Sequence, residues 1–326
     1  MKQILIIIII NLFLLKLYAQ SHDTVYISDK PTNLKELNSV FDDYNSQVII
    51  SPVFMIHRLI FSTNRFSKGK DFDLISYRFN FLPVEQGKNE YSIYYEVTKD
   101  SLLDDIESIN TSCNEFGPYY KKFNPTHYRD GIDSVLFFIT RDCENDLNIY
   151  YAKYKYETYF STYKRVSAYN PIDFINTTFD EGYISISMDC KKIYYCSNKD
   201  GDFDIFSVFD TNGSDAFEMI INNLDYQTEN LSIINSPDEE KCPFIHLNNW
   251  IVFCSNREGG YGGYDLYYSV RKDSTWTTPI NFGNKINSKY DEFRPIILEE
   301  GRFMIFSSNR PSGLGGFDLY IVEIKW

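Results

Sequence analysis

The stretch at residues 307–320, SSNRPSGLGGFDLY, decides the fold because it recurs along the chain. It joins the end of an apolar run to a glycine-rich loop, and joins that loop to an aromatic-Asp-apolar-aromatic sequence. A phosphate-binding glycine loop leads from a strand into a helix, whereas this loop leads into a second strand-like run. The glycines therefore indicate a hairpin turn, in which they permit positive φ.

Four other copies of this hairpin precede it along the chain. They are FSTNRFSKGKDFDLISY at residues 61–77, FITRDCENDLNIYYAKY at 138–154, YCSNKDGDFDIFSV at 195–208 and FCSNREGGYGGYDLYYSV at 253–270. The copy at 138–154 is the most divergent, with Asn148 in place of the aspartate. A second marker, an Asn followed closely by acids, lies before each hairpin. The marker asparagines are Asn38, Asn110, Asn176, Asn235 and Asn287.

The spacing of the markers indicates the architecture. Successive marker asparagines are 52 to 72 residues apart, which is typical of a four-stranded propeller blade with loops of variable length. Five markers precede five hairpins. We therefore predict an all-β, five-bladed β-propeller with four-stranded antiparallel blades.

The ends of the chain complete this prediction. The last repeat lacks a fourth strand, and an orphan strand, DTVYIS at residues 23–28, is expected to complete the last blade and remove its open edge. Six blades is the alternative, but the extra blade would have to lie between residues 77 and 109, where residues 91–97 form the one good strand pattern. In the third repeat, FEMIINN at residues 217–223 is expected to be the fourth strand.

The N-terminal segment indicates export. Residues 1–19 read as a secretory signal peptide, with Lys2 before an apolar run and Ala19 as the small residue for cleavage. Residues 20–326 then form the propeller, with hairpins near 59–77, 135–154, 192–208, 250–270 and 302–325. No later apolar stretch is long enough to span a bilayer, so no transmembrane segment is expected after signal cleavage.

Charge and cysteine content narrow the classes of partner. The formal net charge is −13 at pH 7, which argues against nucleic acid as a partner. Two of the six cysteines, Cys196 and Cys254, occupy equivalent repeat positions and are expected to be buried and unpaired. Disulfide pairing among the other four, Cys113, Cys143, Cys190 and Cys242, is left open.

The repeats resemble the WD-like propeller repeat of the TolB type, found in Gram-negative periplasmic proteins. The closest wording is PINFGNKINSKYDEFRP at residues 279–295 with FSSNRPSGLGGFDLY at 306–320. The variant looks most like the propeller of outer-membrane-associated proteins that also carry an OmpA-like peptidoglycan-binding domain. This resemblance implies a propeller in the periplasm or at the outer membrane, or outside the cell. Because the resemblance is to the propeller alone, peptidoglycan binding is not implied.

Several polar residues recur in the hairpins and are interpreted as structural. An asparagine at the end of the second strand is expected to cap the following turn; these are Asn64, Asn198, Asn256 and Asn309. An aspartate opening the third strand is expected to accept loop N–H groups or to pair with a hairpin arginine, Arg65, Arg257 or Arg310. These aspartates are Asp73, Asp204, Asp265 and Asp318.

The marker acids carry a functional alternative. Loops that enter the innermost strands open on one face of a propeller, so these acids are candidates for a carboxylate ring that binds a cation or a basic peptide at the channel mouth. The other interpretation, which we favour, is that each acid pairs with an arginine or a backbone N–H of its own blade. The acids are Asp43, Glu115, Glu181, Glu239 and Glu292.

No cofactor is expected, apart from a weak candidate calcium site. The sequence NKDGDFD places Asn198, Asp200, Asp202 and Asp204 with the alternation of a calcium loop. It lacks the Glu of a full EF-hand, since Phe209 stands eleven residues after Asn198. It also coincides with the repeat hairpin.

Enzyme motifs are poor in this sequence. The four histidines are scattered without metal-ligand spacing, and no GxSxG motif is present. The favoured function is therefore a non-enzymatic scaffold in the cell envelope that binds an envelope protein or a glycan. The alternative is a propeller-fold carbohydrate-active hydrolase, which needs two carboxylates of unequal role. A channel-facing acid without a counterpart in the other repeats would favour that alternative.

Overall fold

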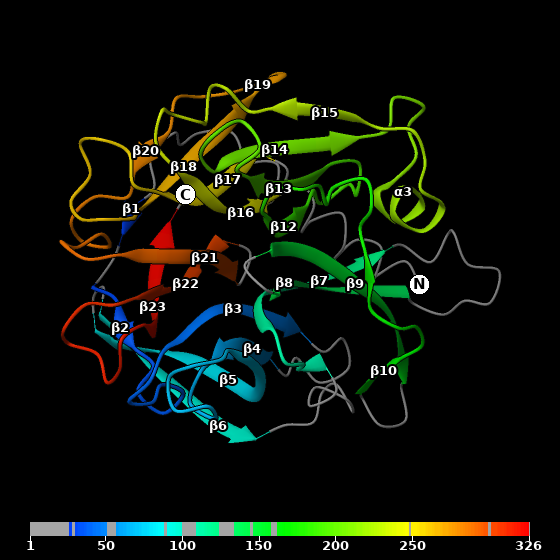
Figure 1. Cartoon of the computed structure of the whole chain (residues 1–326). Helices are drawn as coiled ribbons and strands as arrows, with labels where there is room; N and C mark the ends of the chain where they lie inside the picture. Colours follow the sequence, from blue (N-terminus) through cyan, green and yellow to red (C-terminus); the bar gives the residue numbers. More distant parts are fainter. Residues whose placement is uncertain are drawn as a thin grey trace, which may run out of the picture.

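The computed structural model describes residues 26–27, 30–50, 57–87, 90–99, 109–123, 134–143, 146–157, 162–247, 249–298 and 301–325. Five antiparallel sheets are arranged around a central axis as a five-bladed β-propeller (Figure 1). The predicted fold class is thus confirmed. The signal peptide predicted at residues 1–19 lies outside the described residues, and no described helix is long and apolar enough to cross a membrane.

The strands follow chain order from the innermost to the outermost position of each blade. Blade 1 contains β3 (Asp43–Ile50), β4 (His57–Thr63), β5 (Asp73–Gly87) and β6 (Glu90–Lys99). Blade 2 contains β7 (Asn114–Phe123), β8 (Ser134–Cys143), β9 (Asp146–Glu157), β10 (Thr162–Arg165) and β11 (Asn170–Pro171). Blade 3 contains β12 (Glu181–Ile186), β13 (Ile193–Ser197), β14 (Asp204–Phe209) and β15 (Gln227–Asn230).

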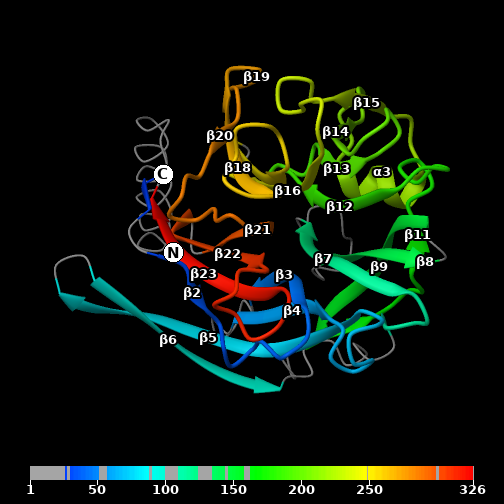
Figure 2. The same ribbon diagram turned by 60° about the vertical axis from the view of Figure 1, so that its left-hand side comes forward.

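The last two blades follow the same plan. Blade 4 contains β16 (Glu240–His246), β17 (Trp250–Ser255), β18 (Asp265–Lys272), β19 (Thr275–Trp276) and β20 (Ile280–Asn281). Blade 5 contains β21 (Glu292–Leu298), β22 (Phe303–Ser308) and β23 (Asp318–Lys325), together with the N-terminal strands β1 (Tyr26–Ile27) and β2 (Thr32–Asn33). In Figure 2, β5 and β6 form a long paired ribbon at the edge of the molecule.

The N-terminal strand closes the last blade, as predicted. Tyr26 pairs with Lys325 and Ile27 with Ile324, so β1 forms the outer strand beside β23. The glycine loop of the last hairpin adds a second link across the closure. A Cβ on Gly315 would lie 1.9 Å from the backbone oxygen of Phe41 in the marker of blade 1. Only glycine permits this approach, and Gly262 meets the marker of blade 5 in the same way.

One predicted strand is a helix. Residues 217–223 were expected to form the fourth strand of blade 3, but α3 (Ala216–Asn222) occupies this segment. The physical reason is a capping box, in which Asp215 accepts from the Glu218 N–H and Glu218 accepts from the Asp215 N–H. The fourth strand is instead β15, which pairs with β14.

The five innermost strands share an irregularity near the axis. Each one contacts the next around a closed ring, and each contains a register shift two residues after its first acid. The residue at this β-bulge has positive φ in every blade. The bulge residues are Asn45, Gly117, Tyr183, Cys242 and Arg294.

Candidate functional site

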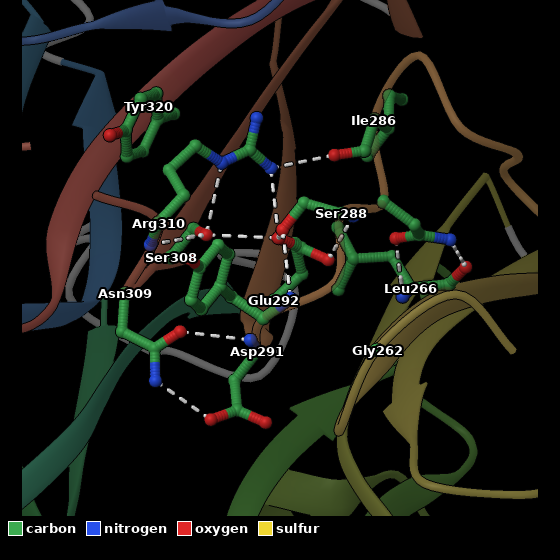
Figure 3. A network of polar contacts seen from close by, with 12 residues as sticks. Gly262, Leu266, Ile286, Ser288, Asp291, Glu292, Ser308, Asn309, Arg310 and Tyr320 are labelled. Carbon is green, nitrogen blue, oxygen red and sulfur yellow. Dashed lines mark hydrogen bonds and ion pairs between the residues drawn. The ribbon is translucent and has the colours of Figure 1, made fainter. Parts of the chain in front are cut away.

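A buried carboxylate at the start of each innermost strand is held by its own blade. In blade 5, Glu292 accepts hydrogen bonds from the Ser288 N–H at 2.8 Å, the Ser288 hydroxyl at 2.6 Å and the Ser308 hydroxyl at 2.9 Å. Arg310 Nη2 pairs with it at 2.9 Å and also donates to the Ile286 carbonyl (Figure 3). We call this arrangement the carboxylate clamp.

The buried acid recurs in all five blades, and in four of them an arginine pairs with it. Arg65 pairs with Asp43 at 2.6 Å, and Arg141 pairs with Glu115 at 3.2 Å. In blade 3, Glu181 accepts from the hydroxyls of Thr177 and Ser197. All the clamp acids are fully buried. The favoured interpretation, own-blade pairing, is therefore what the structure has.

One of the five predicted marker acids was wrong by one position. Glu239 was expected in blade 4, but the clamp acid is Glu240, which pairs with Arg257 at 2.8 Å. Glu240 lies five residues after the marker Asn235, as the other clamp acids do after their own asparagines. Glu239 is half-exposed and pairs with Lys241 at 2.9 Å.

Burial dominates the electrostatics of three clamp acids. Desolvation raises the pKa of Glu115, Glu181 and Glu292 above the usual value for a glutamate. Hydrogen bonds from the neighbouring hydroxyls and backbone N–H groups act in the opposite direction. These carboxyls thus hold their protons more tightly than an exposed glutamate does.

The repeated asparagines bind backward to the markers. Asn64 accepts from the Asp42 N–H and donates to the Asp42 carboxylate at 2.8 Å. Asn198 and Asn309 do the same, and Asn256 accepts from the Glu239 N–H. The expectation that they cap the following turn is corrected, because their amide groups reach back to the marker.

Of the two roles expected for the repeated aspartates, two of these residues take the first and accept hydrogen bonds from loop N–H groups. Asp265 accepts from the N–H groups of Tyr261 and Gly262 in its loop, and Asp318 accepts from those of Leu314 and Gly315. They do not pair with the hairpin arginines, which serve the clamps. Asp204 accepts from Asn230, and Asp73 opens β5.

The candidate calcium loop is held by protein contacts. Asn198 binds Asp180, while the Asn230 amide donates to Asp204 and, at 3.3 Å, to Asp200. Within the described ranges, no three His, Cys, Asp or Glu side chains converge as metal ligands. The pattern read as a calcium loop is thus the blade 3 hairpin.

The structure settles the pairing that the sequence left open among four of the cysteines. Cys113 in the marker of blade 2 forms a disulfide with Cys143 at the end of β8. Cys196 and Cys254 are buried and free, as expected. Cys190 and Cys242 are free as well.

Half-buried aromatic side chains surround the axis on the face formed by the markers and the hairpins. Tyr44 lies 5.0 Å from Phe72 and 5.5 Å from Phe317, measured between ring centroids. Phe317 is 6.0 Å from Phe293, which is 4.5 Å from Tyr264. These rings either follow a clamp acid or precede the first aspartate of a third strand.

The remaining positions of this series complete a belt. Phe116 contacts Phe72 at 5.2 Å, and the Lys241 ammonium lies 4.3 Å from the Phe203 ring. Lys241 also donates to the Tyr264 hydroxyl at 3.1 Å. Leu147 and Gly182 are the two non-aromatic, uncharged members, and a Cβ on Gly182 would touch Leu147. We call these residues the aromatic belt: Tyr44, Phe72, Phe116, Leu147, Gly182, Phe203, Lys241, Tyr264, Phe293 and Phe317.

One acid beside the belt departs from the repeat. Asp142, at the end of β8, occupies the position that holds Asn64 in blade 1, and Asn114 occupies the position of Asp42. Asn114 takes over the usual contact by accepting from the Phe72 N–H at 2.9 Å, as Asp42 accepts from the Phe317 N–H. Asp142 is half-buried, and its carboxylate makes no hydrogen bond or ion pair with any residue that the structure describes.

Asp142 and Asp42 act on one phenol of the belt. Burial raises the pKa of Tyr44 well above its ordinary value, and the carboxylate charges of Asp42 and Asp142 are among the causes that raise it further. Both carboxylates therefore lie near Tyr44 at the same end of the axis. Sequence reasoning missed Asp142 because the hairpin copies, aligned on Phe61 and Phe138, place Arg141 opposite Asn64, and only the strand register places Asp142 there.

Comparisons with known proteins are confined to structures. No family model and no curated protein matches the chain. The catalytic domain of a Coprinopsis cinerea GH62 α-L-arabinofuranosidase is similar, with 10% identity, TM-score 0.51 and coverage of 92% of this chain and 95% of that one. A GH62 hydrolase in complex with xylotriose matches with 10% identity, TM-score 0.50 and coverage of 94% and 99%.

TolB propellers are also among the similar structures. A putative TolB from Agrobacterium tumefaciens has 15% identity, TM-score 0.38 and coverage of 78% of this chain and 86% of that one. The expectation of a non-enzymatic scaffold was wrong by these comparisons, because the propellers matching nearly the whole of both chains are glycoside hydrolases. At these identities, the likeness itself establishes the propeller fold.

Proposed function

We propose that this chain is a carbohydrate-active hydrolase of propeller fold that takes a glycan at the aromatic belt. The observation that carries the proposal is Asp142, an acid outside the repeat pattern whose charge acts on the Tyr44 phenol as that of Asp42 does. A repeated acid has a structural explanation in every blade. Asp142 has no such explanation, and its contacts leave the carboxylate available to a ligand.

The belt supplies the binding surface for this proposal. Sugar rings present C–H faces that pack against aromatic rings, whose faces carry partial negative charge. Tyr44, Phe72, Phe293 and Phe317 keep part of their surface exposed while their packing fixes the ring positions. Rings held in this way bind a sugar with little loss of side-chain entropy.

The chemistry assigned to the acids follows from glycoside hydrolysis. This reaction uses two carboxyl groups, one that protonates the leaving oxygen and one that acts as base or nucleophile. Asp142 is our candidate for one of these roles. Asp42 keeps the structural contacts of its repeat, and it is the candidate for the other role because its charge also acts on Tyr44. The Phe317 N–H and Asn64 amide hold Asp42 in one orientation.

Pentose-containing glycans are the first substrates to test, because the similar hydrolases include an α-L-arabinofuranosidase and one bound to xylotriose. The acidic net charge of −13 favours a neutral glycan over a polyanion. We further propose that the protein is exported and meets this glycan in the cell envelope or outside the cell.

The test is a substrate panel. Purified protein is incubated with arabinoxylan, debranched arabinan, linear xylan and their oligosaccharides, and the released sugars are separated and quantified. Release of a defined sugar from at least one pentose glycan supports the proposal. Absence of release from the whole panel, with a GH62 enzyme active in the same assay, contradicts it.

A further inference from the structure

Arg294 is a buried cation whose charge the fold does not neutralise. It is the bulge residue of β21, and its side chain is fully buried. Its Nη2 donates to the Pro118 carbonyl of blade 2 at 3.2 Å. The Nε and Nη1 atoms, which carry three N–H donors, have no hydrogen-bond partner among the described residues.

The contacts of Arg294 place its guanidinium at the axis. The side chain starts in blade 5, reaches the Pro118 carbonyl in blade 2, and lies with Cζ 5.7 Å from the Tyr183 ring of blade 3. It therefore crosses the centre of the propeller. The equivalent residue of blade 1, Asn45, is also fully buried, and its side-chain amide has no hydrogen-bond partner within the described ranges.

Four other arginines show which contact Arg294 lacks among the described residues, namely an ion pair with a buried carboxylate. Arg65, Arg141, Arg257 and Arg310 each pair with the clamp acid of their own blade. Arg294 forms no ion pair with any residue in the described part of the chain. Its face-on contact with Tyr183 stabilises a cation only weakly compared with a carboxylate.

The two thiols and the phenol nearest Arg294 are uncharged at neutral pH, and the other charge that acts on these thiols, Lys241, is itself a cation. Burial raises the pKa of the Cys242 thiol, the Cys196 thiol and the Tyr183 phenol above their ordinary values. Thiolate or phenolate forms are thus disfavoured, even though the Arg294 charge lowers the pKa of both thiols. The positive charge is consequently left without a counter-charge in a region removed from water, which is costly unless an ion supplies one.

We propose that Arg294 binds a small monovalent anion at the propeller axis, through its Nε and Nη1 groups. The ligand class is a halide or a comparably small anion such as nitrate or formate. Because the Arg294 side chain exposes no surface, an anion of a few atoms fits the position better than a sugar acid or a phosphate ester. The Arg294 side chain links blades 5, 2 and 3 across the ring, and the anion site does not depend on the proposed hydrolysis.

The first experiment measures thermal stability against anion identity. The full chain after signal removal is titrated with chloride, bromide or nitrate at constant ionic strength, with a large organic sulfonate as the replacement anion. A ligand that binds only the folded state raises the melting temperature progressively with its concentration, because the added stability is RT ln(1 + c/Kd), where c is the concentration of the ligand. We expect that dependence in the wild type.

Variants assign the effect to this arginine. Arg294→Met keeps the length of the side chain without the charge and should remove the anion dependence. Arg257→Met is the matched control, since Arg257 is also largely buried and contacts an aromatic ring but pairs with Glu240. It should lower stability while keeping the response to chloride.

Bromide-soaked crystals of the wild type give the deciding readout, including the case where Arg294→Met does not fold. An anomalous bromide peak within hydrogen-bonding distance of Arg294 Nε or Nη1 supports the proposal. A bromide-free position beside Arg294, occupied by water alone, overturns it. Equal melting temperatures in chloride and sulfonate also count against it, and the crystal decides where the two readouts disagree.

Discussion

The hydroxyl of Thr140 in blade 2 accepts a hydrogen bond from the backbone N–H of Tyr183 in blade 3 at 3.0 Å. Both groups are buried, and Tyr183 is the bulge residue of its blade. Ser307 receives the Asn45 N–H in the same way at 3.2 Å, which links blade 5 to blade 1. A short side chain at the end of one second strand thus anchors the bulge of the next blade.

Removing this contact should lower stability. Thr140→Val keeps the shape of the side chain but leaves the buried Tyr183 N–H without its acceptor, at a cost of about 1–3 kcal/mol. Chemical denaturation followed by fluorescence measures the free energy of unfolding. Thr275→Val, at an exposed position of β19, is the control and should change it by less than about 0.5 kcal/mol. Equal effects of the two variants would contradict the assigned role.

The carboxylate clamp predicts that removing a clamp arginine lowers stability more than removing an arginine from an exposed ion pair. Arg310→Met leaves the fully buried Glu292 without its cation and should cost about 3 kcal/mol. Arg302→Met breaks an ion pair with Glu323 whose arginine is 40% exposed, so it should cost less than about 1 kcal/mol. Thermal unfolding of both variants in one buffer makes the comparison. A larger loss for Arg302→Met would disprove the ranking.

Acid should destabilise the protein through His246. Burial lowers the pKa of His246 to about 4, against about 6.5 in an unfolded chain. As pH falls from about 6.5 to about 4, the unfolded chain takes up this proton before the folded one, so the free energy of unfolding decreases by up to about 3 kcal/mol. His246→Gln should remove this part of the slope.

The clamp acids change the free energy of unfolding in the opposite direction to His246. They are present in both the wild type and the His246→Gln variant. Because their pKa values are raised, Glu115, Glu181 and Glu292 bind protons more tightly in the folded protein than in the unfolded chain. Their contribution therefore favours folding as pH falls toward about 4.5. The difference between wild type and His246→Gln across pH 4 to 6.5 isolates the histidine, and an unchanged slope would rule out its role.

The disulfide should stabilise blade 2. Cys113 and Cys143 are 30 residues apart in sequence, and closing a loop of that length restricts the unfolded chain by about 3–4 kcal/mol in the loop-entropy model. Reduction, or the double change to serine, should lower the melting temperature by several degrees. Cys190→Ser serves as the control because Cys190 is free. If reductant leaves the melting temperature unchanged, this stabilising role is refuted.

The propeller could be predicted from the sequence because the residues that pack one hairpin against its neighbour lie within the repeat itself. Glycines such as Gly315 must meet the next marker closely, and aspartates such as Asp318 must hold the loop that contains them. These local requirements recur in the hairpins of blades 4 and 5, so the sequence displays them there most clearly. The helix α3 could not be separated from a strand in this way, because its short apolar run fits both periods and the Asp215–Glu218 capping box decides.

The site was less predictable, since it lies where the copies differ. The exchange of Asp and Asn between Asn114 and Asp142 is a single substitution pair within the most divergent repeat. Arg294 stands at a bulge, whose extra residue disturbs the strand period and hides which way the side chain faces. Contacts across the axis, such as Arg294 with Pro118, join residues far apart in sequence and require the closed ring.

The central claim is tested most directly by measuring kcat for pentose-glycan hydrolysis with three proteins: the wild type, Asp142→Asn and Asp291→Asn. Asp291 accepts from Tyr264 and Asn309 as Asp42 accepts from Phe317 and Asn64, so it controls for the loss of a carboxylate on the same face. We predict that Asp142→Asn lowers kcat by at least about 100-fold with an unchanged melting temperature, while Asp291→Asn keeps kcat within about threefold. Equal kcat values for wild type and Asp142→Asn would contradict the account.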